Sequence, residues 1–373
     1  MKNFKELGIG ADFVKGLAEL NIIEPSEIQK KAIPILMSGA TDLVARAQTG
    51  TGKTAAYGLP LLAQINPKRN AVQGLILCPT RELAKQVAKQ LFKFTKYTDK
   101  IFAEAVYGGE HIDRQISALQ RPTHILVATP GRLIDLVKKK AVNLSEVKTV
   151  VLDEADEMLS MGFKAELDEI LSFLPAAKNK WLFSATLPQG IQEIISKHLS
   201  EDAARLKASG DDIVNKNISH RYAMCEDSEK LPALLQFLKS EGKNRGVIFC
   251  KTKAAAKLLS KQLIAKNIAT DAIHGDLLQK ERDKVMRSFK NETLRILIAT
   301  DLAARGIDIS NLTFVAHYQL PESDEYYTHR SGRTARAGKE GVSMCFVTPT
   351  EVQTLRNYER NLDIKFSKVK RVG

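Results

Sequence analysis

Cysteine, aromatic residues and long apolar runs are all scarce in this chain of 373 residues, which is only 6% aromatic and contains four cysteines. No two cysteines have the spacing of a zinc site or of a redox pair, so a cysteine-held metal is excluded and a reducing compartment fits. Cys78, Cys250 and Cys345 each lie in a short apolar run, which predicts burial. No stretch approaches the roughly 18 apolar residues of a membrane span. Because the start of the chain has no apolar signal segment, we expect a cytoplasmic protein without a membrane partner.

Charge of one sign is present in excess. The chain has 56 lysines and arginines against 43 aspartates and glutamates, a formal net charge of +13. Such a surplus either serves solubility alone or attracts a polyanion, and the second interpretation is favoured because cations that displace counterions from a phosphate backbone gain affinity. The length exceeds one ordinary α/β domain and predicts two.

Short β-rich runs alternate with amphipathic helical segments almost from end to end. The predicted strands are 42–45, 74–78, 102–106, 124–128, 149–152, 181–183, 220–225, 246–250, 269–273, 295–299, 313–318 and 343–347. This alternation predicts the α/β class, with mainly parallel sheets that carry helices on both faces. The alternation is interrupted once, by a small and polar segment. We therefore predict an N-terminal domain at 1–207, a linker at 208–217 and a C-terminal domain at 218–373.

A glycine-rich loop after the first predicted strand indicates nucleotide binding. Two glycines let backbone N–H groups curl around phosphate oxygens, a lysine reaches the β- and γ-phosphates, and a threonine hydroxyl ligates Mg²⁺. The loop consists of Ala47, Gln48, Thr49, Gly50, Thr51, Gly52, Lys53 and Thr54. The expected ligand is a nucleoside triphosphate with Mg²⁺.

Acidic and hydroxyl side chains follow two later strands. Asp153 ends an apolar strand, where it would hold Mg²⁺ largely through water, and Glu154 would deprotonate the attacking water. Ser184 and Thr186 follow the next strand and would sense the γ-phosphate through hydroxyl hydrogen bonds.

Arginines in the second half could complete the same site. Arg333 and Arg336 lie on a loop of small residues, and a guanidinium matches phosphate oxygens and developing charge, so both are predicted arginine fingers and catalytic residues beside Glu154 and Lys53. Asp308 would accept hydrogen bonds from the ribose. Phe4 and Gln29 have two interpretations: a core aromatic and an exposed amide, or a ring stacked on adenine with an amide reading its edge.

Several other strand ends carry glycine, threonine or arginine without acids. Such loops grip a sugar–phosphate chain without reading its bases. The predicted contacts are Pro79, Thr80, Arg81, Gly108, Gly109, Thr129, Gly131, Arg132, Gly275 and Thr300. Each is alone an ordinary turn residue, but their recurrence predicts a nucleic-acid path.

Together these segments resemble the DEAD-box family of ATP-dependent RNA helicases, in family order and over essentially the whole chain. The resemblance rests on Gln29 with Phe4 upstream, 47–54, 79–84, 108–109, 129–132, 153–156, 184–186, 247–250, 274–276, 300–308 and 329–338. It implies two RecA-like lobes, with ATP on the first lobe and RNA across both. One departure is Ala335, which stands where the family commonly has glycine.

The resemblance also implies roles for single residues. Phe4 and Gln29 would recognise adenine, Ser184 and Thr186 would couple ATP binding to strand separation, and His329 would help to join the lobes. The predicted protein is a monomeric, RNA-stimulated ATPase that separates short RNA duplexes or remodels RNA–protein complexes by closing on single-stranded RNA.

Three alternatives remain at this point. A duplex-DNA translocase has similar lobes, although Gln29 and the Asp-Glu-Ala-Asp segment at 153–156 argue against it. A non-unwinding RNA clamp would keep every motif. A P-loop transporter or kinase leaves the second domain and its arginines unexplained.

Overall fold

The chain falls into two compact units, Met1–Ser209 and Gly210–Gly373. The structure is a computed structural model that describes residues 3–39, 41–48, 50–174, 177–208, 216–304, 312–335 and 339–369. Most of the predicted linker, together with Thr49, Asp308 and Arg336, lies outside these ranges. Among the described helices, none has both the length and the apolar character needed to cross a bilayer.

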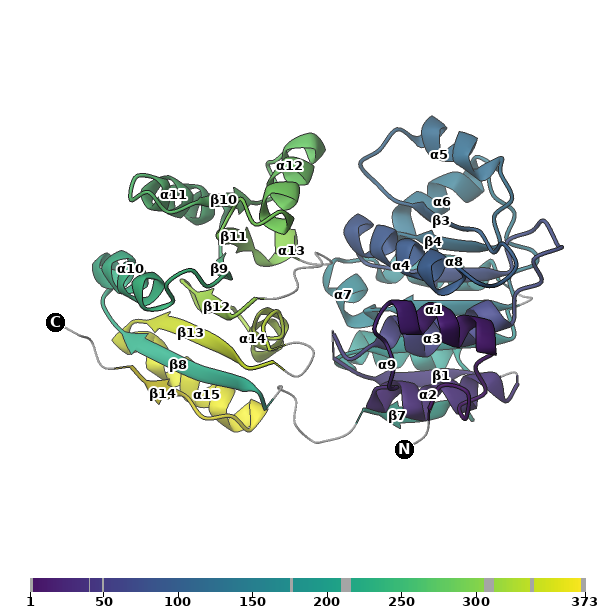
Figure 1. Ribbon diagram of the computed structural model, residues 1–373, viewed down its shortest axis with the longest axis horizontal. Helices are drawn as coiled ribbons and strands as arrows, with labels where there is room; N and C mark the ends of the chain where they lie inside the picture. Colours follow the sequence, from purple (N-terminus) through teal and green to yellow (C-terminus); the bar gives the residue numbers. More distant parts are fainter. Residues whose placement is uncertain are drawn as a thin grey trace. The chain divides into compact units, whose positions relative to one another are not determined.

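The first unit is built on one seven-stranded sheet in the order β3-β4-β2-β5-β6-β1-β7. Figure 1 labels β1, β3, β4 and β7 of this sheet and the helices around it. Its strands are β1 (Leu43–Arg46), β2 (Gly74–Leu77), β3 (Ala103–Val106), β4 (Ile125–Ala128), β5 (Thr149–Asp153), β6 (Asn179–Ser184) and β7 (Ala204–Lys207). Its helices are α1 (Ala11–Glu19), α2 (Glu27–Met37), α3 (Lys53–Ala63), α4 (Arg81–Phe94), α5 (Ile112–Leu119), α6 (Pro130–Lys138), α7 (Ala155–Ser160), α8 (Lys164–Ser172) and α9 (Gln189–His198).

The second unit has a seven-stranded sheet in the order β10-β11-β9-β12-β13-β8-β14. Its strands are β8 (Ile218–Met224), β9 (Gly246–Cys250), β10 (Thr270–Ile273), β11 (Ile296–Thr300), β12 (Phe314–His317), β13 (Gly341–Val347) and β14 (Ser367–Lys368). Its helices are α10 (Lys230–Ser240), α11 (Lys253–Ile264), α12 (Gln279–Lys290), α13 (Asp301–Ala304), α14 (Asp324–Ser331) and α15 (Val352–Leu362), with 3₁₀ turns at Asp227–Glu229 and Pro349–Glu351.

Alternating side chains of each strand enter cores on opposite faces of the sheet. In β5, Val151 packs with α1 to α4, whereas Val150 and Leu152 pack with α6 to α9. In β9, Ile248 packs with α10 and α11, whereas Val247 packs with α12 and α13. Because both faces are covered, the strands are continuous apolar runs.

All described strand pairs are parallel, which confirms the predicted α/β class with two parallel sheets. The twelve expected strands are present, with ends shifted by a few residues. The sequence analysis missed β7 and β14, which are short edge strands. The carboxyl ends of parallel strands share one edge, where ligand-bearing loops gather.

Candidate active site and strand-binding edge

Strand order divides the loops of the first sheet into two groups along one edge. β5, β6 and β1 are neighbours, so the loop after β1, Ser184 at the end of β6 and Asp153 at the end of β5 come together. β3, β4 and β2 occupy the other half of the sheet and lead into the loops predicted to grip a nucleic-acid backbone. The nucleotide group and the backbone-gripping group therefore lie side by side on one unit.

The phosphate loop is shaped by two glycines with left-handed backbone. Gly50 has φ +87° and Gly52 has φ +90°, a region that side chains other than glycine rarely adopt. A Cβ on Gly52 would also lie 2.4 Å from Gln29 Nε2. α3 begins directly after Gly52, so its unpaired N–H groups face the loop.

Gln29 is buried against this loop, which the sequence analysis did not foresee. Its Nε2 donates a hydrogen bond to the Gly52 carbonyl at 3.0 Å, and its Oε1 accepts one from the Ser26 N–H at 2.9 Å. The Ser26 hydroxyl donates to the Thr51 carbonyl at 2.7 Å.

Phe4 is 2% exposed and belongs to the first core. Adenine recognition by Phe4 and Gln29 stays a prediction, but Gln29 also supports the phosphate loop.

Two charged groups in the site have buried atoms without a protein partner. Among the described residues, Lys53 Nζ donates no hydrogen bond and Asp153 Oδ1 accepts none. Burial raises the pKa of Asp153 to about 6, while the nearby positive charge of Lys53 acts to lower it. A buried ionic group is unfavourable unless a group of opposite charge compensates it. A bound polyanion would compensate Lys53, and a bound cation would compensate Asp153. The residues therefore fit a triphosphate with Mg²⁺.

Asp153 is in turn contacted by Tyr57 of α3. The Tyr57 hydroxyl donates to Asp153 Oδ2 at 2.8 Å. Burial and the Asp153 charge raise the pKa of Tyr57 well above its usual value, so the hydroxyl stays a donor. No motif drew attention to Tyr57, because its role depends on the distance between α3 and β5.

Glu154 has a strained backbone. It precedes α7 with φ +53° and ψ +53°, the left-handed region, and its side chain is buried. For a residue with a Cβ this conformation costs roughly 1–2 kcal/mol. Such strain is concentrated at functional sites. The geometry thus supports the prediction that Glu154 acts on the nucleotide.

Asp156, in the first turn of α7, connects the loop after β5 to the loop after β6 through hydrogen bonds. Its Oδ2 accepts hydrogen bonds from the Thr186 N–H at 2.8 Å and from the Thr186 hydroxyl at 2.9 Å. The Asp156 N–H donates to the Ser184 hydroxyl at 3.1 Å. The Ser184 carbonyl accepts from the Ala47 N–H at 2.8 Å. A continuous chain of bonds thus runs from the acidic loop through Ser184 to the start of the phosphate loop, and the sequence analysis assigned Asp156 no role in it.

The backbone-gripping loops, which follow β2, β3 and β4, are held in place by hydrogen bonds within and between them. Thr80 caps α4 by accepting from the Leu83 N–H, and Thr129 accepts from the Gly108 N–H at 3.3 Å. Arg132 donates to the Glu110 carbonyl at 2.8 Å and to the Gln115 side chain at 2.9 Å. Both terminal nitrogens of Arg132 thus brace these loops, and a contact with RNA would add to these bonds.

The glycines of these loops border open space. A Cβ built on Gly108, Gly109, Gly131 or Gly275 would meet no atom within 4 Å. Arg81 lies 4.9 Å from the centre of the Tyr107 ring, where a cation is held by the face of the aromatic ring. Pro79 and Thr300 are buried at their strand ends. In the first unit, the glycines thus leave open space and Arg81 supplies a positive charge, two features that suit a sugar–phosphate chain.

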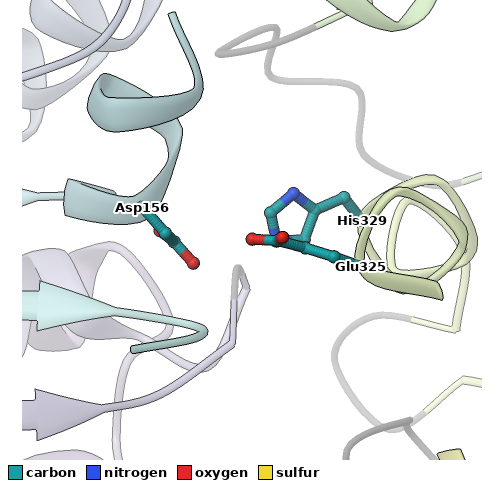
Figure 2. Close-up of side chains that lie close together, drawn as sticks. All are labelled: Asp156, Glu325 and His329. Carbon is teal, nitrogen blue, oxygen red and sulfur yellow. The ribbon is translucent and has the colours of Figure 1, made fainter. Parts of the chain in front are cut away.

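In the second unit, α14 carries part of the arginine loop. Glu325 and His329 project from the same side of α14, one turn apart (Figure 2). Arg333 follows the helix, is 8% exposed, and its N–H donates to the Arg330 carbonyl. Ala335 has φ +54°, the left-handed region, which explains why glycine suits this position.

Arg330, the first arginine of this loop, is a structural residue. Its Nε and Nη2 donate to the two carboxylate oxygens of Asp301 at 2.5 and 2.7 Å, and its Nη1 donates to the Gln319 carbonyl at 2.8 Å. The guanidinium also stacks on Phe249. Because Asp301 follows Thr300 at the end of β11, this pair ties a predicted RNA-binding loop to α14.

Removing Arg330 should therefore destabilise the second unit selectively. Arg330→Ala leaves Asp301 without its buried partner, and we expect a loss of about 3–5 kcal/mol in the free energy of unfolding. The matched control is Arg356→Ala, which removes an exposed pair with Glu359 and should cost no more than about 1 kcal/mol.

Urea unfolding followed by two signals tests this prediction. The single tryptophan, Trp181, lies in β6 and reports the first unit, whereas circular dichroism reports both units. Arg330→Ala should shift the circular dichroism transition and leave the tryptophan transition in place. Equal stability of Arg330→Ala and Arg356→Ala contradicts the structural role.

Comparison with known proteins agrees with this geometry. Residues 26–194 match the DEAD/DEAH box helicase family, and residues 229–338 match the helicase conserved C-terminal domain. The chain is 41% identical over 370 residues to the DEAD-box ATP-dependent RNA helicase CshA of Geobacillus kaustophilus, covering 99% of this chain and 79% of that protein. The CshA protein of Bacillus cereus is 40% identical over 369 residues, covering 99% and 70%. The chain belongs to the DEAD-box helicase family.

Solved structures of DEAD-box helicases have the same fold. Saccharomyces cerevisiae Dbp5, in a structure bound to RNA and ADP BeF3, is 31% identical and superimposes with a TM-score of 0.91 over 99% of this chain and 96% of that chain. The predicted RecA-like character of both units is thereby confirmed. In this DEAD-box protein, Asp153, Glu154 and Asp156 are the acids of the segment that names the family.

Proposed function

We propose that this DEAD-box protein is an ATP-dependent RNA helicase that locally separates short RNA duplexes or remodels RNA–protein complexes. One observation carries the proposal: the nucleotide loops after β1, β5 and β6 occupy one half of a strand edge, and the loop after β2 and the glycine-containing loops after β3 and β4 occupy the neighbouring half. A change at the γ-phosphate would reach Asp156 and Thr186 through the hydrogen bonds that join the phosphate loop, Ser184 and Asp156.

The first unit binds the nucleotide. Lys53 and the N–H groups at the start of α3 hold the phosphates, and Gln29 and Phe4 recognise adenine. Thr54 and Asp153 would hold Mg²⁺, Asp153 largely through water, and the bound ion would offset the negative charge of the phosphates. Glu154 takes a proton from the attacking water. Gln48, Thr49 and Thr51 shape the loop around the phosphates.

The second unit completes the reaction. Arg333 and Arg336 stabilise charge that develops on the γ-phosphate, Asp308 binds the ribose, and His329 helps to join the units. Arginine is suited to this task because its planar fork of donors matches phosphate oxygens and it never loses its charge.

RNA is held by its backbone. Thr80, Arg81, the paired glycines 108 and 109, Thr129, Gly131 and Arg132 on the first unit, with Gly275 and Thr300 on the second, contact phosphates and sugars without reading bases. Contacts to 2′-hydroxyl groups favour RNA over DNA. A cytoplasmic location and a monomeric state stay predictions.

ATP and RNA each favour closure of the two units. A ligand that binds the closed arrangement better raises the affinity of the other ligand, typically by 5–150-fold. Closure bends the gripped strand out of duplex geometry and expels its partner locally. Hydrolysis and phosphate release remove the contacts of Arg333 and Arg336, and the units part.

Displacement of a short labelled strand from an RNA duplex tests the proposal. ATP with Mg²⁺ at stated salt should release the strand, and ATP turnover should rise with RNA but not with DNA. Stimulation by duplex DNA instead indicates a translocase. RNA-stimulated turnover without strand release indicates a clamp. Either result overturns the proposed activity.

A further inference from the structure

Tyr57 is a fully buried polar residue beside the nucleotide site that no recognised motif requires. It lies one turn after Lys53 on α3, is 0% exposed, and packs its ring against Phe183 of β6 with centroids 5.2 Å apart. A hydroxyl at such a position needs a partner, and phenylalanine would fill the same space without that requirement. The hydroxyl therefore has a purpose beyond packing.

The partner of the hydroxyl is one particular oxygen of Asp153. Tyr57 donates its single hydrogen to Oδ2 at 2.8 Å, whereas Oδ1 has no hydrogen-bond partner among the described residues. Tyr57 thus contacts Asp153, one of the two residues proposed to hold Mg²⁺.

This arrangement sets the orientation of the carboxylate. The terminal torsion of an aspartate is broad, so a carboxylate without a fixed oxygen samples many orientations. The bond from Tyr57 fixes Oδ2, and Oδ1 is the carboxylate oxygen that has no hydrogen-bond partner among the described residues. Partners of this kind, which orient a ligand without touching the metal, typically change metal affinity by 10–100-fold.

We propose that Tyr57 is a positioning residue for the Mg²⁺ site: by holding Asp153 Oδ2 it presents Oδ1 to the ion or to its coordinated water. The inference rests on the proposed function, because it concerns the metal that accompanies ATP. It predicts that Tyr57→Phe, which removes only the hydroxyl, weakens metal binding more than it affects catalysis.

Binding of Mn²⁺ to the full chain tests the inference without turnover. Free Mn²⁺ is measured by electron paramagnetic resonance in the presence of a nonhydrolysable ATP analogue, and Tyr57→Phe should bind the ion about 10-fold more weakly than the parent. The matched control is Tyr358→Phe, which removes a buried hydroxyl that donates to the Pro321 carbonyl at 2.8 Å in the second unit. Tyr358→Phe should keep the parental Mn²⁺ affinity.

A titration of ATP turnover with Mg²⁺ separates positioning from loss of structure. In Tyr57→Phe the Mg²⁺ concentration for half-maximal turnover should rise about 10-fold, while turnover at saturating Mg²⁺ stays near the parental value. A purely structural role would lower the plateau and leave the midpoint in place, which would overturn the inference.

The remaining outcomes distinguish the inference from the function on which it rests. Mn²⁺ affinity of Tyr57→Phe within twofold of the parent overturns the role of Tyr57 and leaves the helicase function standing. An equal loss in Tyr358→Phe overturns it as well. Failure of the parent to bind Mn²⁺ with the nucleotide overturns both.

Discussion

Replacing Glu154 with glutamine is expected to lower RNA-stimulated ATP turnover by about 10²–10⁴-fold, the contribution typical of a positioned general base. The amide keeps the size of the side chain but accepts no proton from water. Binding of ATP and RNA should persist, because the phosphate loop, Lys53 and the backbone-gripping loops are unchanged. Steady-state turnover and equilibrium binding of a labelled oligoribonucleotide with ATP measure the two effects separately.

Glu201→Gln is the control for this change, because Glu201 is exposed and lies outside the strand ends of the site. It should turn over ATP at the parental rate. If Glu154→Gln hydrolyses ATP as fast as Glu201→Gln, the assignment of the base is wrong. If Glu154→Gln also loses RNA binding, its main effect is on the folding of the loop, and the strained backbone at this position would be the reason.

Replacing Arg333 with alanine is expected to lower turnover by about 10³–10⁵-fold, the range typical of an arginine that stabilises transferring phosphate. Arg333→Lys should recover only part of this loss, since lysine restores the charge without the planar fork. The affinity for single-stranded RNA without nucleotide should stay parental. Turnover and RNA binding are measured at one salt concentration, because phosphate contacts depend on salt.

Arg356→Ala serves as the control for Arg333→Ala, since it removes an exposed arginine from α15 of the same unit. Urea unfolding of both variants checks stability, because Arg333 is mostly buried. A drop in turnover of less than about tenfold in a folded Arg333→Ala variant contradicts the assignment. Parental turnover in Arg333→Lys shows that charge alone is sufficient.

Local sequence was enough to predict the parts of the site that lie within one loop. The phosphate loop depends on glycines at 50 and 52 and on the lysine that follows, all within a few residues of one strand. Strand identity was predictable for the same reason, because a strand buried on both faces must be a continuous apolar run. β7 and β14 were missed because edge strands with one neighbour need no such run.

Partners that come from different strands or helices were not predictable. Gln29 lies against Gly52, Tyr57 against Asp153 and Asp156 against Thr186, and each pair is joined only by packing of the sheet and its helices. The three arginines after His329 look alike in sequence, yet Arg330 is committed to Asp301 while Arg333 follows the helix end. Only its surroundings identify Arg330 as part of a structural ion pair.

By itself, then, the sequence determined the class of protein, the two parallel sheets, the phosphate loop and the acids that end β5. Those features follow from periodicity and from residue types within short segments. The tertiary structure decided which of the charged and polar side chains hold the site in place. The deciding contacts join β5, β6 and β1, and join the end of β11 to α14. They link residues that are far apart in the chain, so the residue pattern within a short segment cannot predict them.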